Sequence, residues 1–406
     1  MSYERLIARR FLQRDKNNFS RPLVNIATYT IALGVVVMIM AICILRGFQH
    51  EITNKVIGFG AHINIRSYAY VNDYDEAVVT MTDEQVHKVA ALPLIDHIQP
   101  VANKGGMLKT DDQIQGIVFK GVDRTFDTSF FASNLIRGHF ANTFDSSAAN
   151  EIIISQRLAQ KMHLDTGDKA RTYFWAGNTY RPRAFRIVGI YNTDLSEFDD
   201  HYIIGNISQL RTINRWDTSA ATSYEVIINN FKHLDQALND VKSVTRSDLA
   251  VTSIVEEQPS MFAWLQLLNS NIALILIIMA VVCSASVVSA LLIMIFEKTS
   301  MIGLLKTLGS TNSSIRRIFI LKAISIVGKG IFVGNIIAIA FCLMQQQFHI
   351  IRLDSESYSM TFVPIDANPL IFILVSAGTF IVASAALLIP ATYISHIDPA
   401  KTTRQE

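Results

Sequence analysis

Four long apolar runs interrupt an otherwise polar chain, at residues 22–46, 272–296, 318–344 and 369–390. Each has at least about 20 residues, which as a helix is enough to cross the hydrocarbon core of a bilayer. The polar stretch 47–271 between the first two runs is long enough for a sizeable folded domain. The pattern predicts a membrane protein with four transmembrane α-helices and a large α+β extracytoplasmic domain inserted between helices 1 and 2.

Within 47–271, short apolar segments alternate with helical patterns. A threonine cap at Thr82, followed by an acidic first turn, predicts a helix over 82–91. The pair Gly177-Asn178 predicts the turn of a β-hairpin. The acidic run 192–202 lacks the ligand spacing of a calcium loop, so we interpret it as a solvated loop. The other helices are expected at 156–162, 234–244 and 260–268, the last continuous with the second apolar run, and the strands at 62–66, 98–101, 116–120, 152–154, 170–174, 185–190 and 225–228.

Charge indicates which ends of the spans face the cytoplasm. Residues 1–21 and 297–317 are rich in Lys and Arg, and such segments remain inside. The stretch 345–368 carries a net negative charge, as expected outside. The pattern therefore predicts cytoplasmic termini, with an amphipathic segment at 1–21, a tail at 391–406, and the inserted domain on the far side of the membrane.

The loop 297–317 contains a helical pattern of its own. Met301, Leu304, Leu305 and Leu308 recur at helical spacing and predict one apolar stripe, and Gly309 follows where a helix C-terminus favours glycine. One interpretation is a basic amphipathic helix on the membrane surface. The other is a coupling helix that docks in a groove of a cytosolic partner.

This loop carries a resemblance to a known family. The pattern E-K-x-x-x-I-G-L-L-K-x-L-G-x-x-x-x-x-I-R-R-I-F, from 297 to 319, resembles the loop after the second span in FtsX-like permeases of ABC transporters. That superfamily includes MacB-type efflux permeases and lipoprotein-releasing (LolC/LolE-type) permeases. R-G-F at 46–48, A-H at 61–62 and Y-x-x-x-x-V-P at 358–364 resemble the lipoprotein-releasing branch, and D-P-A-K at 398–401 resembles the C-terminal motif of the superfamily.

The resemblance implies a permease subunit in a bacterial inner membrane, with a MacB-like periplasmic core domain. It implies a dimer of cytosolic ABC ATPase subunits that binds ATP and Mg²⁺, a second permease copy or paralogue, a lipid-anchored protein substrate and a periplasmic carrier. The alternatives are a MacB-like efflux permease and an FtsX-like activator of a cell-wall hydrolase. The implied ATPase-coupling interface comprises Glu297, Lys298, Met301, Gly303, Leu304, Leu305, Lys306, Leu308 and Gly309.

Two further groups are candidate binding residues. The hairpin tip expected at 175–184 resembles the hook with which some lipoprotein-releasing permeases capture their carrier; the alternative is an ordinary hairpin whose tryptophan covers the core. Polar residues early in the first span interrupt its apolar surface. They either allow lateral entry of substrate or satisfy helix–helix packing. These groups are Trp175, Tyr180, Arg181, Pro182 and Arg183, and Asn25, Thr28, Tyr29 and Thr30.

Composition and motifs argue against an enzyme. The chain is 50% hydrophobic and 17% charged, too apolar for an ordinary soluble enzyme, and its net charge of +2 argues against nucleic-acid binding. It contains no phosphate-binding loop, nucleophile elbow or H-E-x-x-H zinc motif, and its three cysteines lie in apolar runs. We therefore expect no catalytic, metal or cofactor site. Lys322 and Lys329 stand within the third apolar run, where glycines at 328, 330 and 334 would allow a helix to approach closely.

Overall fold

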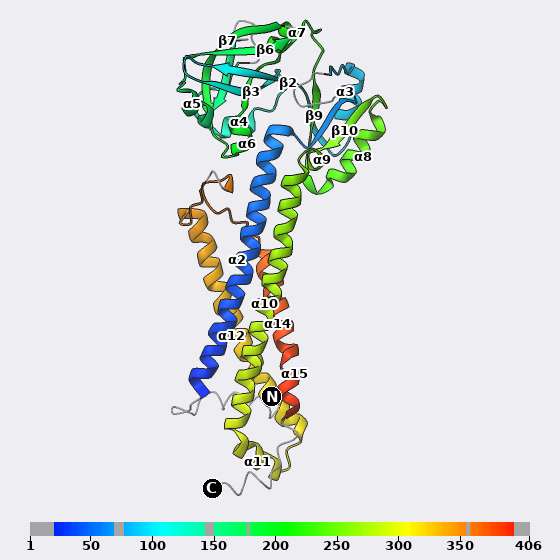
Figure 1. Ribbon diagram of the computed structural model, residues 1–406. Helices are drawn as coiled ribbons and strands as arrows, with labels where there is room; N and C mark the ends of the chain where they lie inside the picture. Colours follow the sequence, from blue (N-terminus) through cyan, green and yellow to red (C-terminus); the bar gives the residue numbers. More distant parts are fainter. Residues whose placement is uncertain (1–19, 69–76, 143–149, 177–178, 355–357, 394–406) are drawn as a thin grey trace. The chain divides into compact units, whose positions relative to one another are not determined.

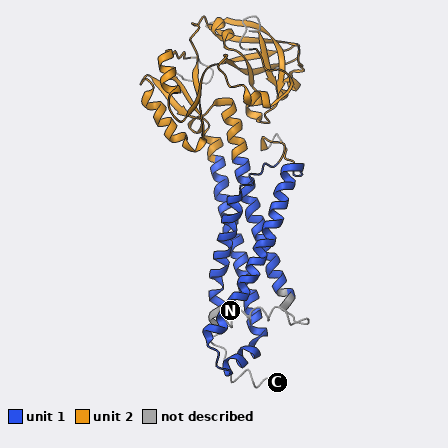
Figure 2. Cartoon of the chain, turned by 180° about the vertical axis from the view of Figure 1, so that it is seen from behind, with its two compact units in different colours: residues 1–49, 264–351, 363–406 blue, residues 50–263, 352–362 orange. Residues whose placement is uncertain are grey.

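The computed structural model describes residues 20–68, 77–142, 150–176, 179–354 and 358–393 (Figure 1). The chain divides into two compact units, a helical unit of residues 1–49, 264–351 and 363–406 and a sheet unit of residues 50–263 and 352–362 (Figure 2). The predicted amphipathic segment before residue 20, the turn at Gly177-Asn178 and the C-terminal motif at 398–401 lie outside the described residues.

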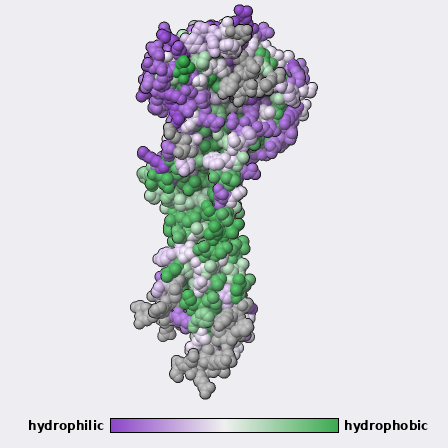
Figure 3. Space-filling model, viewed as in Figure 1, coloured by the Kyte–Doolittle hydropathy of each residue, from purple (hydrophilic) through white to green (hydrophobic). Residues whose placement is uncertain are grey.

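Long helices form the helical unit, and four of them are apolar enough to cross a membrane. In Figure 3, apolar residues cover most of the surface seen over these helices. α10 begins at Pro259, so the helix expected at 260–268 is continuous with the second span, as predicted. The helix of the first span, by contrast, does not end at residue 46, because α2 continues to Gly60. The helices are α2 (Ser20–Gly60), α10 (Pro259–Glu297), α12 (Asn312–Phe348), α14 (Pro369–Ala386) and α15 (Leu388–Tyr393).

Small residues let α12 pack closely on α2. A β-carbon added at Gly330 would lie 2.8 Å from Cβ of Ile31, and one added at Gly334 would lie 2.8 Å from the carbonyl oxygen of Ala32. The predicted close approach is therefore confirmed at these two glycines, and α2 is the helix that approaches. Gly328 has no such neighbour within 4 Å, so it plays no part in the contact.

One buried side chain, that of Gln345, fixes the start of the loop that follows α12. Gln345, at the last full turn, donates from Nε2 to the carbonyls of Ile351 (3.1 Å) and Val363 (3.2 Å). Its Oε1 accepts from the backbone N–H of Ile351 at 2.9 Å. Because all three polar contacts of one buried amide go to backbone groups, the loop between α12 and α14 has a defined path at its base.

A ten-stranded sheet forms the other unit. Its strand order is β10-β1-β9-β2-β3-β8-β5-β7-β4, with β6 paired to β2 and β7. Every predicted strand overlaps an observed one, although several observed strands are longer. The strands are β1 (Ile63–Ser67), β2 (Ile95–Lys109), β3 (Ile114–Val122), β4 (Leu135–Gly138), β5 (Glu151–Ser155), β6 (Lys169–Ala176), β7 (Thr179–Tyr191), β8 (Tyr202–Asn206), β9 (Ser223–Ile228) and β10 (Leu249–Ser253).

Helices cover two apolar cores within the sheet unit. One core gathers residues of β3, β5 and β7 under α5 and α7, and the other gathers β1, β9 and β10 under α3 and α8. The predicted cap is confirmed, since Thr82 and Gln85 form a capping box at the start of α3. The helices are α3 (Asp83–Ala90), α4 (Ser129–Ser133), α5 (Gln156–Met162), α6 (Ser196–Asp199), α7 (Ile207–Asn214), η2 (Phe231–His233), α8 (Leu234–Val244) and α9 (Ile254–Glu257).

The interpretation of 192–202 as a solvated loop was wrong. This stretch contains α6 and the start of β8, and Leu195, Phe198 and Asp199 are buried. The sequence misled because the acidic residues alternate with apolar ones that turn inward. Only the tertiary structure shows that even a carboxylate, that of Asp199, is enclosed here.

Candidate functional site

The helix predicted within the loop 297–317 is present as α11 (Thr299–Thr307). However, the four apolar residues of the predicted stripe do not form one face, and Leu308 follows the last residue of α11 as its C-cap. Met301 and Leu305 pack on the core of the helical unit, whereas Leu304 is 58% exposed and Leu308 is 74% exposed. The expected stripe is split because Ile302, which lies outside it, is fully buried and turns the buried face of the helix to one side.

α11 ends in a defined turn at its C-terminus. Gly309 has a positive φ of +89°, as predicted, and the N–H of Ser310 donates to the carbonyl of Leu305 at 2.9 Å. At the N-terminal end, Nζ of Lys298 forms an ion pair with Oε1 of Glu297 at 3.7 Å. Of the predicted coupling residues, Leu304 and Leu308 are thus exposed, whereas Gly303 and Leu305 are buried within the helical unit.

The predicted hairpin is formed by β6 and β7. Trp175 and Tyr180 lie opposite each other in its register and make an edge-to-face pair with ring centroids 4.7 Å apart. They are 52% and 56% exposed, so the tryptophan does not cover the core. Phe174 and Phe185 do so instead, from the opposite face of the hairpin.

The hairpin is longer than predicted, because both strands extend almost to the turn. Arg181, Pro182 and Arg183 therefore lie within β7 and not in the tip, which is a correction to the expected site. Beside Trp175 and Tyr180 lies an open cleft of about 900 Å³. Its other lining residues are Gly105, Gly106, Met107, Gly116, Ile117, Val118, Tyr173 and His201.

The polar residues of the first span lie in the first turns of α2. The hydroxyl of Thr28 donates to the carbonyl of Val24 at 2.8 Å, and that of Thr30 to the carbonyl of Ile26 at 2.9 Å. Both hydroxyls are thus satisfied within their own helix. Asn25 and Tyr29 are exposed, and their role in substrate entry stays a prediction.

The sheet unit contains a buried ion pair that was not predicted. Lys120 of β3 is 1% exposed, and its Nζ lies 2.7 Å from Oε1 of Glu225 on β9. The same Nζ also donates to the carbonyl of Phe59, in the last turn of α2. Gln99 donates to the second carboxylate oxygen of Glu225 at 2.9 Å. A buried charge needs this kind of pairing, and here the pairing reaches the end of a long helix.

A second carboxylate links the end of α2 to the start of α10. Glu257, two residues before Pro259, accepts from Asn64 at 2.8 Å and lies 3.2 Å from Arg66. Asn64 also donates to the carbonyl of Gly60 at 2.9 Å. Burial raises the pKa of Glu257, and the positive charge of Arg66 opposes that rise. Both long helices therefore terminate at the polar groups around β1, β3 and β9.

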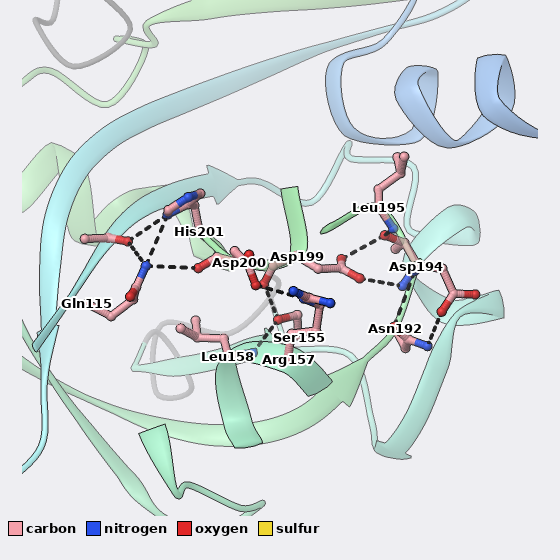
Figure 4. Close-up of polar contacts among 12 residues, drawn as sticks. Gln115, Ser155, Arg157, Leu158, Asn192, Asp194, Leu195, Asp199, Asp200 and His201 are labelled. Atoms are coloured by element: carbon pink, nitrogen blue, oxygen red, sulfur yellow. Dashed lines mark hydrogen bonds and ion pairs between the residues drawn. The ribbon is translucent and has the colours of Figure 1, made fainter. Parts of the chain in front are cut away.

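α6 lies next to the end of α2, and Figure 4 shows the polar contacts of Asp199 and Asp200 at its C-terminal end. Phe198 stacks on Phe59 with ring centroids 4.7 Å apart. The carboxylate of Asp199 accepts from the hydroxyl (2.8 Å) and the N–H (3.1 Å) of Thr193, and burial raises its pKa to about 6. Its neighbour Asp200 pairs with Arg157 of α5 at 2.9 Å. Side-chain contacts thus fix α6 between α5 and the end of α2.

Family models match most of the chain. A model of the MacB-like periplasmic core domain matches residues 26–244, which is more than half of the 406 residues. A model of the FtsX-like permease C-terminal region matches residues 273–399. The chain belongs to the FtsX-like permeases that carry a MacB-like periplasmic core domain. The superfamily expected from the loop pattern is thereby confirmed, and the permease has the predicted order of domains.

Full-length relatives of this permease are lipoprotein-releasing system transmembrane proteins. LolC of Xylella fastidiosa (strain 9a5c) is 23% identical, with 98% of each chain covered. LolC of Neisseria meningitidis serogroup B (strain MC58) is 22% identical, with 100% of each chain covered. LolE of Haemophilus influenzae is 20% identical, with 96% of this chain and 95% of the relative covered. Because LolC and LolE both match over nearly the whole length, the permease resembles the lipoprotein-releasing branch as a whole.

Proposed function

We propose that this permease is the membrane subunit of an ABC transporter that releases lipid-anchored proteins from the bacterial inner membrane. ATP and Mg²⁺ bind to a separate dimeric cytosolic ATPase, and a second permease, a copy or a paralogue, completes the assembly. The names of the full-length relatives support this function, and the four apolar helices support the membrane location. The basic residues of the α11 loop support a cytoplasmic position for it and for the termini.

The unbroken course of α10 carries the proposal. This helix has 39 residues from Pro259 to Glu297, and α11 follows it directly. Because every turn of a helix is hydrogen-bonded to the next, a displacement of α11 is transmitted along α10 toward its first turn. There the carboxylate of Glu257 holds Asn64 and Arg66 of β1. Movement at the ATPase would thus reach the sheet without any chemistry in this chain.

The exposed residues of the sheet unit fit the delivery step of this proposal. Trp175 and Tyr180 form an exposed aromatic pair beside an open cleft, and exposed aromatic residues are typical of protein interfaces. In the proposed function they meet a soluble periplasmic carrier that accepts the released protein. The lipid anchor would enter beside α2, where Asn25 and Tyr29 are exposed.

The substitution Leu304→Asp tests the coupling interface. Leu304 is exposed, so the chain should still fold and insert, but a charge would replace an apolar contact with the ATPase. We expect co-purification of the ATPase with the full-length permease to fall by at least about tenfold, equivalent to roughly 1.4 kcal/mol. Ser313→Asp is the matched control, because it adds the same charge at an exposed position in the first turn of α12.

Undiminished co-purification in Leu304→Asp would contradict the coupling role of α11. The same preparation distinguishes the alternative functions by the soluble partner that it retains. A lipoprotein carrier supports the proposed function, whereas an efflux adaptor or a peptidoglycan hydrolase would replace it with the MacB-like or the FtsX-like alternative.

A further inference from the structure

Two lysines lie on one face of α12, within its apolar run. Lys322 and Lys329 are seven residues apart, so about two helical turns separate them along the same face. Lys322 is half-buried, and Lys329 is exposed. Gly328 leaves space beside Lys329, since no atom outside the local helix lies within 4 Å of a β-carbon added there. The Lys329 side chain therefore points away from the packed core of the helical unit.

These charges have no counter-charge within the membrane helices. The four apolar runs at 22–46, 272–296, 318–344 and 369–390 contain no Asp or Glu. Neither lysine forms an ion pair within the part of the chain that the structure describes. A second copy of this chain would likewise contribute no Asp or Glu from its apolar runs. Because an unpaired charge inside a bilayer is costly, these lysines favour an anion supplied by another molecule.

The depth of the lysines follows from the contact between α12 and α2. Gly330 packs beside Ile31 and Gly334 beside Val35, so the two helices run in the same direction at equal height. By that alignment Lys322 is level with the start of the apolar run of α2, and Lys329 lies about 10 Å further in. Helical side chains lean toward the helix N-terminus, which for α12 is the end next to α11. Both ammonium groups can thus reach the same edge of the bilayer.

Beyond Lys329 the same face of α12 becomes apolar. Phe332 and Ile336 follow at three and seven residues, and both are exposed. Ile339 and Leu343 continue the face and are exposed as well. The surface therefore carries two cations at the edge of the bilayer and an apolar strip that extends inward, which matches the distribution of charge and apolar length in a phospholipid.

We infer that this face of α12 binds an anionic phospholipid of the leaflet nearest α11. Lys322 and Lys329 hold the headgroup phosphate, and the acyl chains lie along the strip from Phe332 to Leu343. A net negative headgroup is preferred over a zwitterionic one, because two positive charges face a single phosphate. Contact with a carboxylate of a different subunit is the competing explanation, and it is decided by the test.

The test is a titration of the purified full-length permease with phosphatidylglycerol, followed by native mass spectrometry. Each lysine near the headgroup should contribute about fivefold in affinity. We therefore expect Lys329→Gln to weaken binding about fivefold and Lys322→Gln/Lys329→Gln about 25-fold. Lys329→Arg should keep the affinity within about twofold, and binding of phosphatidylcholine should change little. Lys161→Gln, at an exposed lysine of α5, is the matched control.

Three outcomes would overturn the inference. Lys329→Gln could bind phosphatidylglycerol as tightly as the unchanged protein, whether or not it loses another subunit. Lys329→Arg could lose binding as fully as Lys329→Gln, which would indicate a purely structural role. Soluble glycerol 3-phosphate could displace the lipid at millimolar concentration, which would indicate a site for free phosphate. The assay measures lipid binding alone, so its result is independent of the proposed transport function.

Discussion

Replacement of Lys120 by Met is the most direct test of how the sheet unit holds the end of α2. The change keeps the length and most of the volume of the side chain but removes its charge. Glu225 would then remain as a buried carboxylate with Gln99 as its remaining side-chain partner, and the carbonyl of Phe59 would lose its donor. Breaking a buried ion pair by removing one partner costs about 3–5 kcal/mol.

The expected loss is measurable in the full-length protein. For a unit of this size, about 3–5 kcal/mol corresponds to a fall of roughly 6–20 °C in the melting temperature. Amide hydrogen exchange gives a local measurement, because protection should fall first in β3 and β9 and in the last turns of α2. Lys109→Met is the matched control, since Lys109 is an exposed strand lysine whose replacement should cost less than about 0.5 kcal/mol.

A second variant separates the ion pair from general damage to the core. Adding Glu225→Gln to Lys120→Met removes the uncompensated charge, so the double variant should recover part of the lost stability. A cost below about 1 kcal/mol for Lys120→Met would refute the idea that this ion pair stabilises the sheet unit. So would a double variant that is less stable than the unchanged protein by the full sum of the two single costs.

Two further predictions concern packing and pH. Gly330→Ala should lower the melting temperature of the full-length permease, because its β-carbon would lie 2.8 Å from Ile31, whereas Gly328→Ala should be neutral; equal effects would contradict the assigned contact. Asp199 has a pKa raised by burial from 3.8 to about 6, so the folded state binds more protons than the unfolded state between about pH 4 and 6. Its contribution to stability should therefore fall as pH rises through that window, by about 2–3 kcal/mol at most, and Asp199→Asn should remove this slope in pH-dependent thermal melts. An unchanged slope would indicate that the carboxylate is better solvated than its position suggests.

The local pattern of the sequence was sufficient wherever a feature depends on neighbouring residues. The apolar runs predict the four spans, because the bilayer imposes a minimum length on each. Thr82 and Gln85 cap α3, and Gly309 ends α11, through contacts within a few residues. The same holds for the helix 234–244, which the structure reproduces as α8.

The continuation of α2 beyond the first span had a signal that was missed. Residues 46–60 include glycines and charges and resemble a loop, yet Phe48, Ile52, Val56 and Phe59 recur at helical spacing. All four are buried. This spacing was sufficient to predict a helix, but what its apolar face packs against, including Phe198 and Phe131, is set by residues far along the chain.

Only the tertiary structure decides the sites that depend on distant residues. Lys120 and Glu225 are 105 positions apart, and each looks like an ordinary strand residue in its own sequence context. The stripe of α11 was correctly placed on a helix, but the burial of Ile302 decides that Leu304 faces outward and Leu305 inward. Sequence periodicity determines which residues share a face, whereas the direction of that face is determined by whichever elements the fold brings against it.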